Sequence, residues 1–93
     1  MIGFSNVNSP KIDITKKTSI TIATTDWSNN SYSITDSHIN TNSIVDIYYS
    51  QESKTVIASS SPSYSISGNT LTITVSVVPT SNIVIDCIRI ENI

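Results

Sequence analysis

One stretch of the sequence, Asp36-Ser37-His38, places an acid, a hydroxyl and the single histidine next to one another. A hydrolytic triad needs these residue types, with a base that contacts both the nucleophile and the orienting acid. Neighbours in an extended segment point to opposite faces, so three consecutive residues do not form such a line. We therefore expect His38 to lie in a surface loop, without a catalytic role.

The carboxylates and loop amides could in principle serve glycoside hydrolysis or hold a hard cation. Glycosidases need two carboxylates that face each other across a cleft, and no spacing among the seven acidic residues singles out a pair. Asp36, Asn40 and Asn42 offer oxygens to Ca²⁺, but their spacing is not that of an EF-hand and no bidentate Glu follows. Gly3 and Gly68 are the only glycines, which excludes a glycine-rich phosphate loop. The sequence predicts no enzyme, no metal and no cofactor.

Cys87 is the only cysteine, so an intramolecular disulfide is impossible. It stands in the apolar run from Ile83 to Ile90, where Ile83, Ile85 and Cys87 share one face of an extended strand. We expect a buried structural thiol, because a nucleophilic cysteine needs a nearby base and an electropositive setting.

The aromatic side chains are the best candidates for contact with another molecule. Tyr48 and Tyr49 point to opposite faces of one predicted strand, so one of them is expected to be accessible. Trp27 follows a strand and is expected to close one end of the core, since its large apolar area is valuable there.

The composition excludes several classes of partner. Net charge is −2, charged residues are 13% of the chain, and the basic residues are scattered, so nucleic acid is not an expected partner. No apolar run approaches the roughly 20 residues of a membrane span. The first residues lack a charged segment followed by an apolar one, and no classical signal peptide is expected.

Alternation of apolar and polar residues predicts strands, because β-branched residues dominate and period two is the mark of a half-buried strand. The predicted strands cover residues 18–24, 31–35, 43–50, 63–67, 69–77 and 82–90. Short turns separate them, including a hairpin at Ser67-Gly68-Asn69. The expected fold is all-β, a single immunoglobulin-like β-sandwich of about six to seven strands with a short N-terminal arm.

Two local assignments stay open. Residues 54–58 suit either a short helical turn or an edge strand. In the last strand the apolar parity changes, because Ile83, Ile85 and Cys87 share one face while Ile88 and Ile90 fall on the other. Either a β-bulge or burial of both faces explains this change, and burial of both faces is the favoured interpretation.

The N-terminal residues behave differently from the rest. We assign residues 1–16 to an N-terminal arm and possible first strand, and residues 17–93 to the sandwich. Ile2, Phe4 and Val7 alternate with small polar residues before Pro10 interrupts. The segment is either the first strand of the sandwich preceded by a loose tail, or an arm that pairs with the open sheet edge of a neighbouring chain. The candidate partner-binding residues are Ile2, Phe4, Val7, Tyr48 and Tyr49.

The order of these features resembles a β-module of tailed-bacteriophage virion surface proteins. The resemblance covers roughly Ile20 to Asn92. It consists of a strand, the Trp27-Ser28 turn, a Tyr-x-Ile strand, an Asn-Ser before a Val-x-Ile strand, a Leu-x-Ile strand, a Pro-Thr turn and a final apolar strand. The connection at residues 51–63 is rich in Ser where the family is usually rich in Ala. The motifs mark structural positions, so they carry no functional residues over.

The resemblance implies a protein of the virion, assembled in the host cytoplasm. The most favoured function is a capsid decoration protein that binds the major capsid protein or another virion protein outside the head, with a homo-oligomer as a possible state. The alternative is a head-fibre or tail-fibre adhesion module that binds carbohydrate of the host surface.

Overall fold

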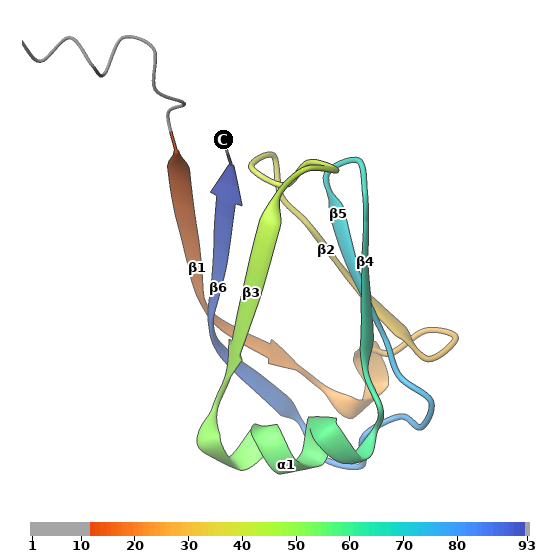
Figure 1. The fold of residues 1–93 in the computed structure, drawn as a ribbon. Helices are drawn as coiled ribbons and strands as arrows, with labels where there is room; N and C mark the ends of the chain where they lie inside the picture. Colours follow the sequence, from red (N-terminus) through yellow and green to blue (C-terminus); the bar gives the residue numbers. More distant parts are fainter. Residues whose placement is uncertain (1–11, 93) are drawn as a thin grey trace, which may run out of the picture.

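The computed structural model describes residues 12–92, and Figure 1 shows how the chain is arranged. In chain order the elements are β1 (Asp13–Ile22), η2 (Thr24–Asp26), β2 (Ser31–Thr35), β3 (Ile44–Tyr49), α1 (Gln51–Ser59), β4 (Ser63–Ser67), β5 (Thr70–Thr74) and β6 (Ile83–Asn92). Ile2, Phe4 and Val7, three of the candidate binding residues, lie outside the described residues.

The strands form two three-stranded sheets with the orders β1-β6-β3 and β2-β5-β4, and every neighbouring pair is antiparallel. Both sheets contribute to one apolar core, and Figure 1 shows the two sheets as separate layers. The chain is therefore mostly β, which is consistent with the predicted all-β fold. The buried apolar residues are Ile22, Ile34, Ile39, Ile57, Leu71, Ile73, Val75, Ile83, Ile85, Ile88 and Ile90.

Two tight turns follow from residues that tolerate positive φ. Gly68 has a φ of 58° and connects β4 to β5, as the sequence predicts. Asn29 and Asn30 have φ values of 51° and 63°, and the flanking Ser28 and Ser31 exchange two backbone hydrogen bonds. Asn is one of the few side chains that adopt this conformation at low cost.

The parity change in β6 comes from a β-bulge, so the favoured interpretation of a strand buried on both faces is wrong. Against β3, the register shifts between Tyr48, which pairs with Cys87, and Tyr49, which pairs with Ile85. The extra residue is Asp86, and it is exposed. Ile83 and Ile85 before the bulge and Ile88 and Ile90 after it are all buried, because one added residue returns the apolar side chains to the core.

Strand β1 carries a matching irregularity beside the bulge. Ser19 has a φ of 58° and stands between the pairs Thr18–Cys87 and Ile20–Ile85. Figure 1 shows that both β1 and β6 bend, so that the two halves of each strand run in different directions. β1 continues without interruption across residue 17, the boundary that the sequence suggested between arm and sandwich.

Residues 51–59 form helix α1, which settles the choice between helix and edge strand. The Ser50 side chain accepts a hydrogen bond from the Ser53 backbone and caps the helix. The helix lies across one end of the two sheets in Figure 1 and buries Ile57. No helix within residues 12–92 is long and apolar enough to cross a membrane.

Hydrogen bonds fasten the start of α1 to β6. The buried Ser53 hydroxyl accepts from the Val84 backbone N–H at 2.8 Å, and the Ser50 N–H donates to the Val84 carbonyl at 2.9 Å. The N–H and C=O groups of Val84 thus both form hydrogen bonds where β6 passes beside the helix.

Candidate binding surfaces

The Asp36 carboxylate forms a cluster with Lys17 and His38, but the cluster lacks the arrangement of a triad. Lys17 Nζ donates to Asp36 Oδ2 at 2.8 Å, and His38 Nδ1 lies 2.8 Å from Asp36 Oδ1. The His38 backbone N–H also donates to Oδ1 at 2.8 Å. Within residues 12–92, Ser37 forms no hydrogen bond to either side chain, and it is exposed. The cluster ties β1 to the loop that follows β2.

The same contacts control the ionisation of Asp36. The hydrogen bond from Lys17 and then those from the backbone and ring of His38 hold the pKa of Asp36 well below its usual range. A carboxyl group held in its ionised form is a poor proton donor or acceptor near neutral pH. His38 itself is an exposed turn residue, as the sequence predicts.

Cys87 does not lie in the core, and the prediction of a buried thiol is wrong. The bulge at Asp86 turns its side chain away from Ile83 and Ile85, and the thiol is partly exposed between Tyr48 and Thr18. Among the described residues, no group of three His, Cys, Asp or Glu side chains is placed to hold a metal ion.

The outer face of the β1-β6-β3 sheet carries exposed apolar side chains. We define it by the rows of paired residues Ile14–Glu91–Ile44, Lys16–Arg89–Asp46 and Thr18–Cys87–Tyr48. Directly paired residues of antiparallel strands project from the same face. Ile14, Ile44 and Tyr48 are 47%, 52% and 51% exposed. Covering apolar side chains that are this exposed with another molecule lowers the free energy, because their surface is removed from water.

Ion pairs occupy the middle of this outer face. Arg89 Nη1 lies 2.7 Å from Glu91 Oε1 and 3.8 Å from Asp46 Oδ2. The pairs orient a guanidinium group between the isoleucines of one row and the tyrosine of the other. Aromatic side chains and Arg are enriched at protein interfaces.

The outer face of the β2-β5-β4 sheet has a contrasting composition. We call it the hydroxyl face, because it consists of three rows of paired Ser and Thr: Ser31–Thr74–Ser63, Ser33–Thr72–Ser65 and Thr35–Thr70–Ser67. In each row the β2 and β5 hydroxyl oxygens lie 3.1–3.3 Å apart. These small polar side chains offer little apolar area to a partner.

Tyr48 and Tyr49 point to opposite faces of β3, as the sequence predicts. Tyr48 lies on the outer face, whereas Tyr49 is half-buried against the core. The Tyr49 and Tyr64 hydroxyls are 2.9 Å apart, so they join β3 to β4 across the opening between the sheets. Burial and then this hydrogen bond raise the pKa of Tyr49 well above its usual range.

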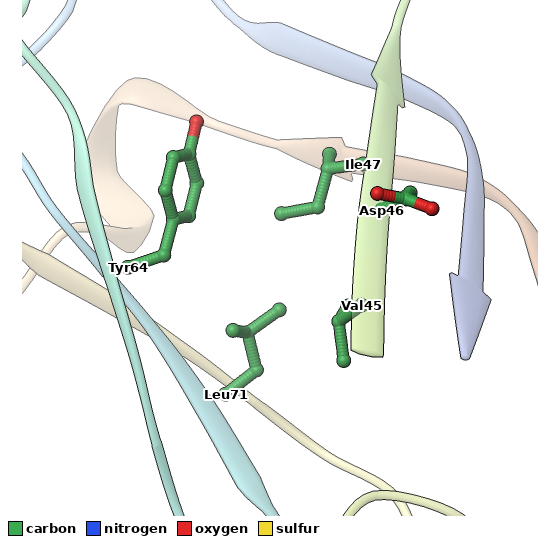
Figure 2. A pocket seen from close by; sticks show the side chains of 5 residues that line it. All are labelled: Val45, Asp46, Ile47, Tyr64 and Leu71. Atoms are coloured by element: carbon green, nitrogen blue, oxygen red, sulfur yellow. The ribbon is translucent and has the colours of Figure 1, made fainter. Parts of the chain in front are cut away.

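Beside this contact, a groove opens between β3 and β4. Its volume is about 210 Å³, and Val45, Asp46, Ile47, Tyr64 and Leu71 line it. Figure 2 shows Val45 and Ile47 from β3 on one side and Tyr64 and Leu71 on the other. The Asp46 carboxylate lies at the β3 side of the groove in the same view.

Trp27 packs where the sequence places it, against the rim of the core. Its ring centroid lies 6.1 Å from that of Tyr32, with the planes inclined by 59°. The Trp27 indole N–H is buried without a hydrogen-bond partner within residues 12–92. Trp27 thus packs at the rim of the core.

Sequence reasoning selected Tyr48 but missed Ile14, Ile44 and the hydroxyl face. The Ser-x-Ser and Thr-x-Thr alternation in residues 31–35, 63–67 and 70–74 could have revealed that face, since paired strands align such repeats. Ile14 and Ile44 carried no such signal, because an isoleucine in a strand is normally assigned to the core. Comparisons with family models, curated proteins and solved structures find no match for this chain.

Proposed function

We propose that this protein is a bacteriophage structural protein, a capsid decoration protein that binds the outside of the head. The observation that carries the proposal is the difference between the two outer faces. One presents Ile14, Ile44 and Tyr48 around Arg89, and the other presents only hydroxyl side chains. A molecule that lies on a particle with one face and meets water with the other needs this asymmetry.

The proposal assigns the β1-β6-β3 outer face to the contact with the major capsid protein. Its exposed isoleucines and Tyr48 supply apolar area, and Arg89, Asp46 and Glu91 supply directional polar contacts. The resemblance of residues 20–92 to modules of virion surface proteins supports the choice of a phage particle as the partner. We also propose that the fold is an immunoglobulin-like sandwich, and two antiparallel sheets around one core are consistent with it.

Co-sedimentation of the purified protein with tail-less heads of the phage that encodes it tests the proposal. We expect the wild-type protein to bind the heads saturably. Ile44→Asn and Tyr48→Ser should each weaken it by about tenfold or more, because both remove apolar contact area at the proposed interface. Ser65→Ala, on the hydroxyl face, is the matched control and should bind like wild type. Equal binding by all variants, or no binding of wild type, would contradict the proposal.

A second candidate function is adhesion of a fibre module to host carbohydrate, and the exposed Tyr48 ring favours it. Aromatic faces exposed on a rigid strand can pack against sugar rings. A glycan array probed with wild-type protein and with Tyr48→Ala tests this function. Binding that Tyr48→Ala abolishes would support adhesion, and an array without signal would count against it.

A further inference from the structure

The groove between β3 and β4 is an opening into the core that the described chain leaves uncovered. Val45, Ile47 and Leu71 supply apolar walls, and Tyr64 is 48% exposed at the rim. A cavity of about 150 Å³ with aliphatic walls accepts a benzene ring. The groove, at about 210 Å³, is therefore large enough for a phenylalanine ring.

The backbone beside the groove is also available. β3 pairs with β6 on one side, and within residues 12–92 no strand pairs with its other side. An edge strand of this kind presents alternate N–H and C=O groups that an added strand can bind. A segment that binds here would satisfy backbone groups and insert every second side chain into the groove.

Residues 2–4 of the chain match these two requirements. In an extended strand, Ile2 and Phe4 would project from one face about 7 Å apart, the same spacing as Val45 and Ile47. Gly3 and Ser5 would face away from the groove, and Val7 has the opposite parity to Phe4. Residues 1–9 contain no ionisable side chain, so the Asp46 carboxylate beside the groove does not repel their side chains.

We propose that this groove binds residues 2–7 of a second copy of the chain, which add a strand to the edge of β3 and insert Ile2 and Phe4. The sheet order indicates a second copy, because the segment continues from β1, which lies at the opposite edge of its sheet from β3. If the exchange is reciprocal, it forms a closed dimer. This inference does not depend on the virion proposal.

Sedimentation equilibrium of the purified full chain tests the exchange. We expect a concentration-dependent dimer whose dissociation constant rises about tenfold or more in Phe4→Ala, because the ring no longer fills the groove. Val45→Phe, which fills the groove from inside, should have the same effect. Ser5→Ala is the matched control and should dimerise like wild type. Trp27 fluorescence checks that each variant is folded. A monomer at all concentrations, or a dimer that both Phe4→Ala and Val45→Phe leave unchanged, would overturn the proposal.

A cross-link identifies which chain supplies the segment. In a Cys87→Ser background, Phe4→Cys in one tagged chain and Tyr64→Cys in a second chain of different size should form a mixed disulfide-linked dimer under mild oxidation. Ser65→Cys places the thiol on the hydroxyl face instead, and it should not form a disulfide with Phe4→Cys. When Phe4→Cys and Tyr64→Cys are combined in one chain, cross-linking confined to monomers would show that the arm binds its own groove and would refute exchange.

Discussion

At the scale of single residues, Asp36 shows how an acid and a histidine can meet without the arrangement of a triad. Its carboxylate accepts hydrogen bonds from Lys17 and from both the backbone and the ring of His38. The contacts join β1 to the loop after β2, and the strands β1 and β2 belong to different sheets. The cluster therefore stabilises the packing of the sheets through charge.

Asp36→Asn should lower the free energy of unfolding by about 1 kcal/mol at pH 7, since it removes charged hydrogen bonds at a partly exposed site. The pKa of Asp36 is lowered on folding. Its contribution is thus present above the unfolded pKa, near 4, and is lost as the pH falls toward the folded value. Urea unfolding at pH 7, 4 and 2.5 measures this. The difference between variant and wild type should shrink at pH 2.5, and a constant difference would contradict the assignment.

The backbone conformation of Ser19 leads to a second prediction at this scale. Its φ of 58° is unfavourable for any side chain with a Cβ, by about 1 kcal/mol. Ser19→Gly should therefore be more stable than Ser19→Ala by about that amount. At Thr21, an exposed position of the same strand without positive φ, the order should reverse because glycine weakens a strand. Thermal unfolding of the four variants decides, and the same order at both positions would be evidence against the strained backbone.

At the scale of elements, β6 and α1 explain how one core forms from two bent sheets. The bulge at Asp86 lets Ile83, Ile85, Ile88 and Ile90 all face inward despite the change of parity. α1 then covers the end of the core and is fastened to β6 through Ser53 and Val84.

Ser53→Ala should lower the free energy of unfolding by about 1–3 kcal/mol, because the Val84 N–H loses its acceptor in a buried setting. Ser59→Ala is the control in the same helix, since the Ser59 hydroxyl donates to the Thr55 carbonyl at an exposed position. It should change stability by less than about 0.5 kcal/mol. Chemical denaturation measures both, and equal effects would show that the Ser53 contact is not important.

The strands at residues 31–35 and 63–67 could be predicted from their alternation. The strand predicted at residues 69–77 ends at Thr74 in the structure, although the alternation continues to Val77. Residues 51–59 could not be assigned, because nine residues with few apolar side chains carry a weak helical period. The capping Ser50 was the available signal. The parity change at Asp86 had two physical explanations, and only strand pairing distinguishes them. Choosing the wrong one also misplaced Cys87.

At the scale of the whole molecule, the two sheets give the protein two unlike faces. Sequence periodicity separates inward from outward positions but does not say which strands pair. It therefore could not group Ile14, Ile44 and Tyr48 on one face, or the hydroxyls on the other. The pairing of β1 and β3 with the central β6 creates the proposed contact surface.

The accessibility of Cys87 on that surface offers the most direct measurement of the central proposal. The rate at which a bulky maleimide modifies Cys87 is measured with the protein free and with saturating phage heads. We predict slower modification on the heads, because the β1-β6-β3 outer face is covered. A Ser65→Cys variant in a Cys87→Ser background reports the hydroxyl face and should react equally fast in both states. Equal reactivity of Cys87 in the free and head-bound protein would contradict the account.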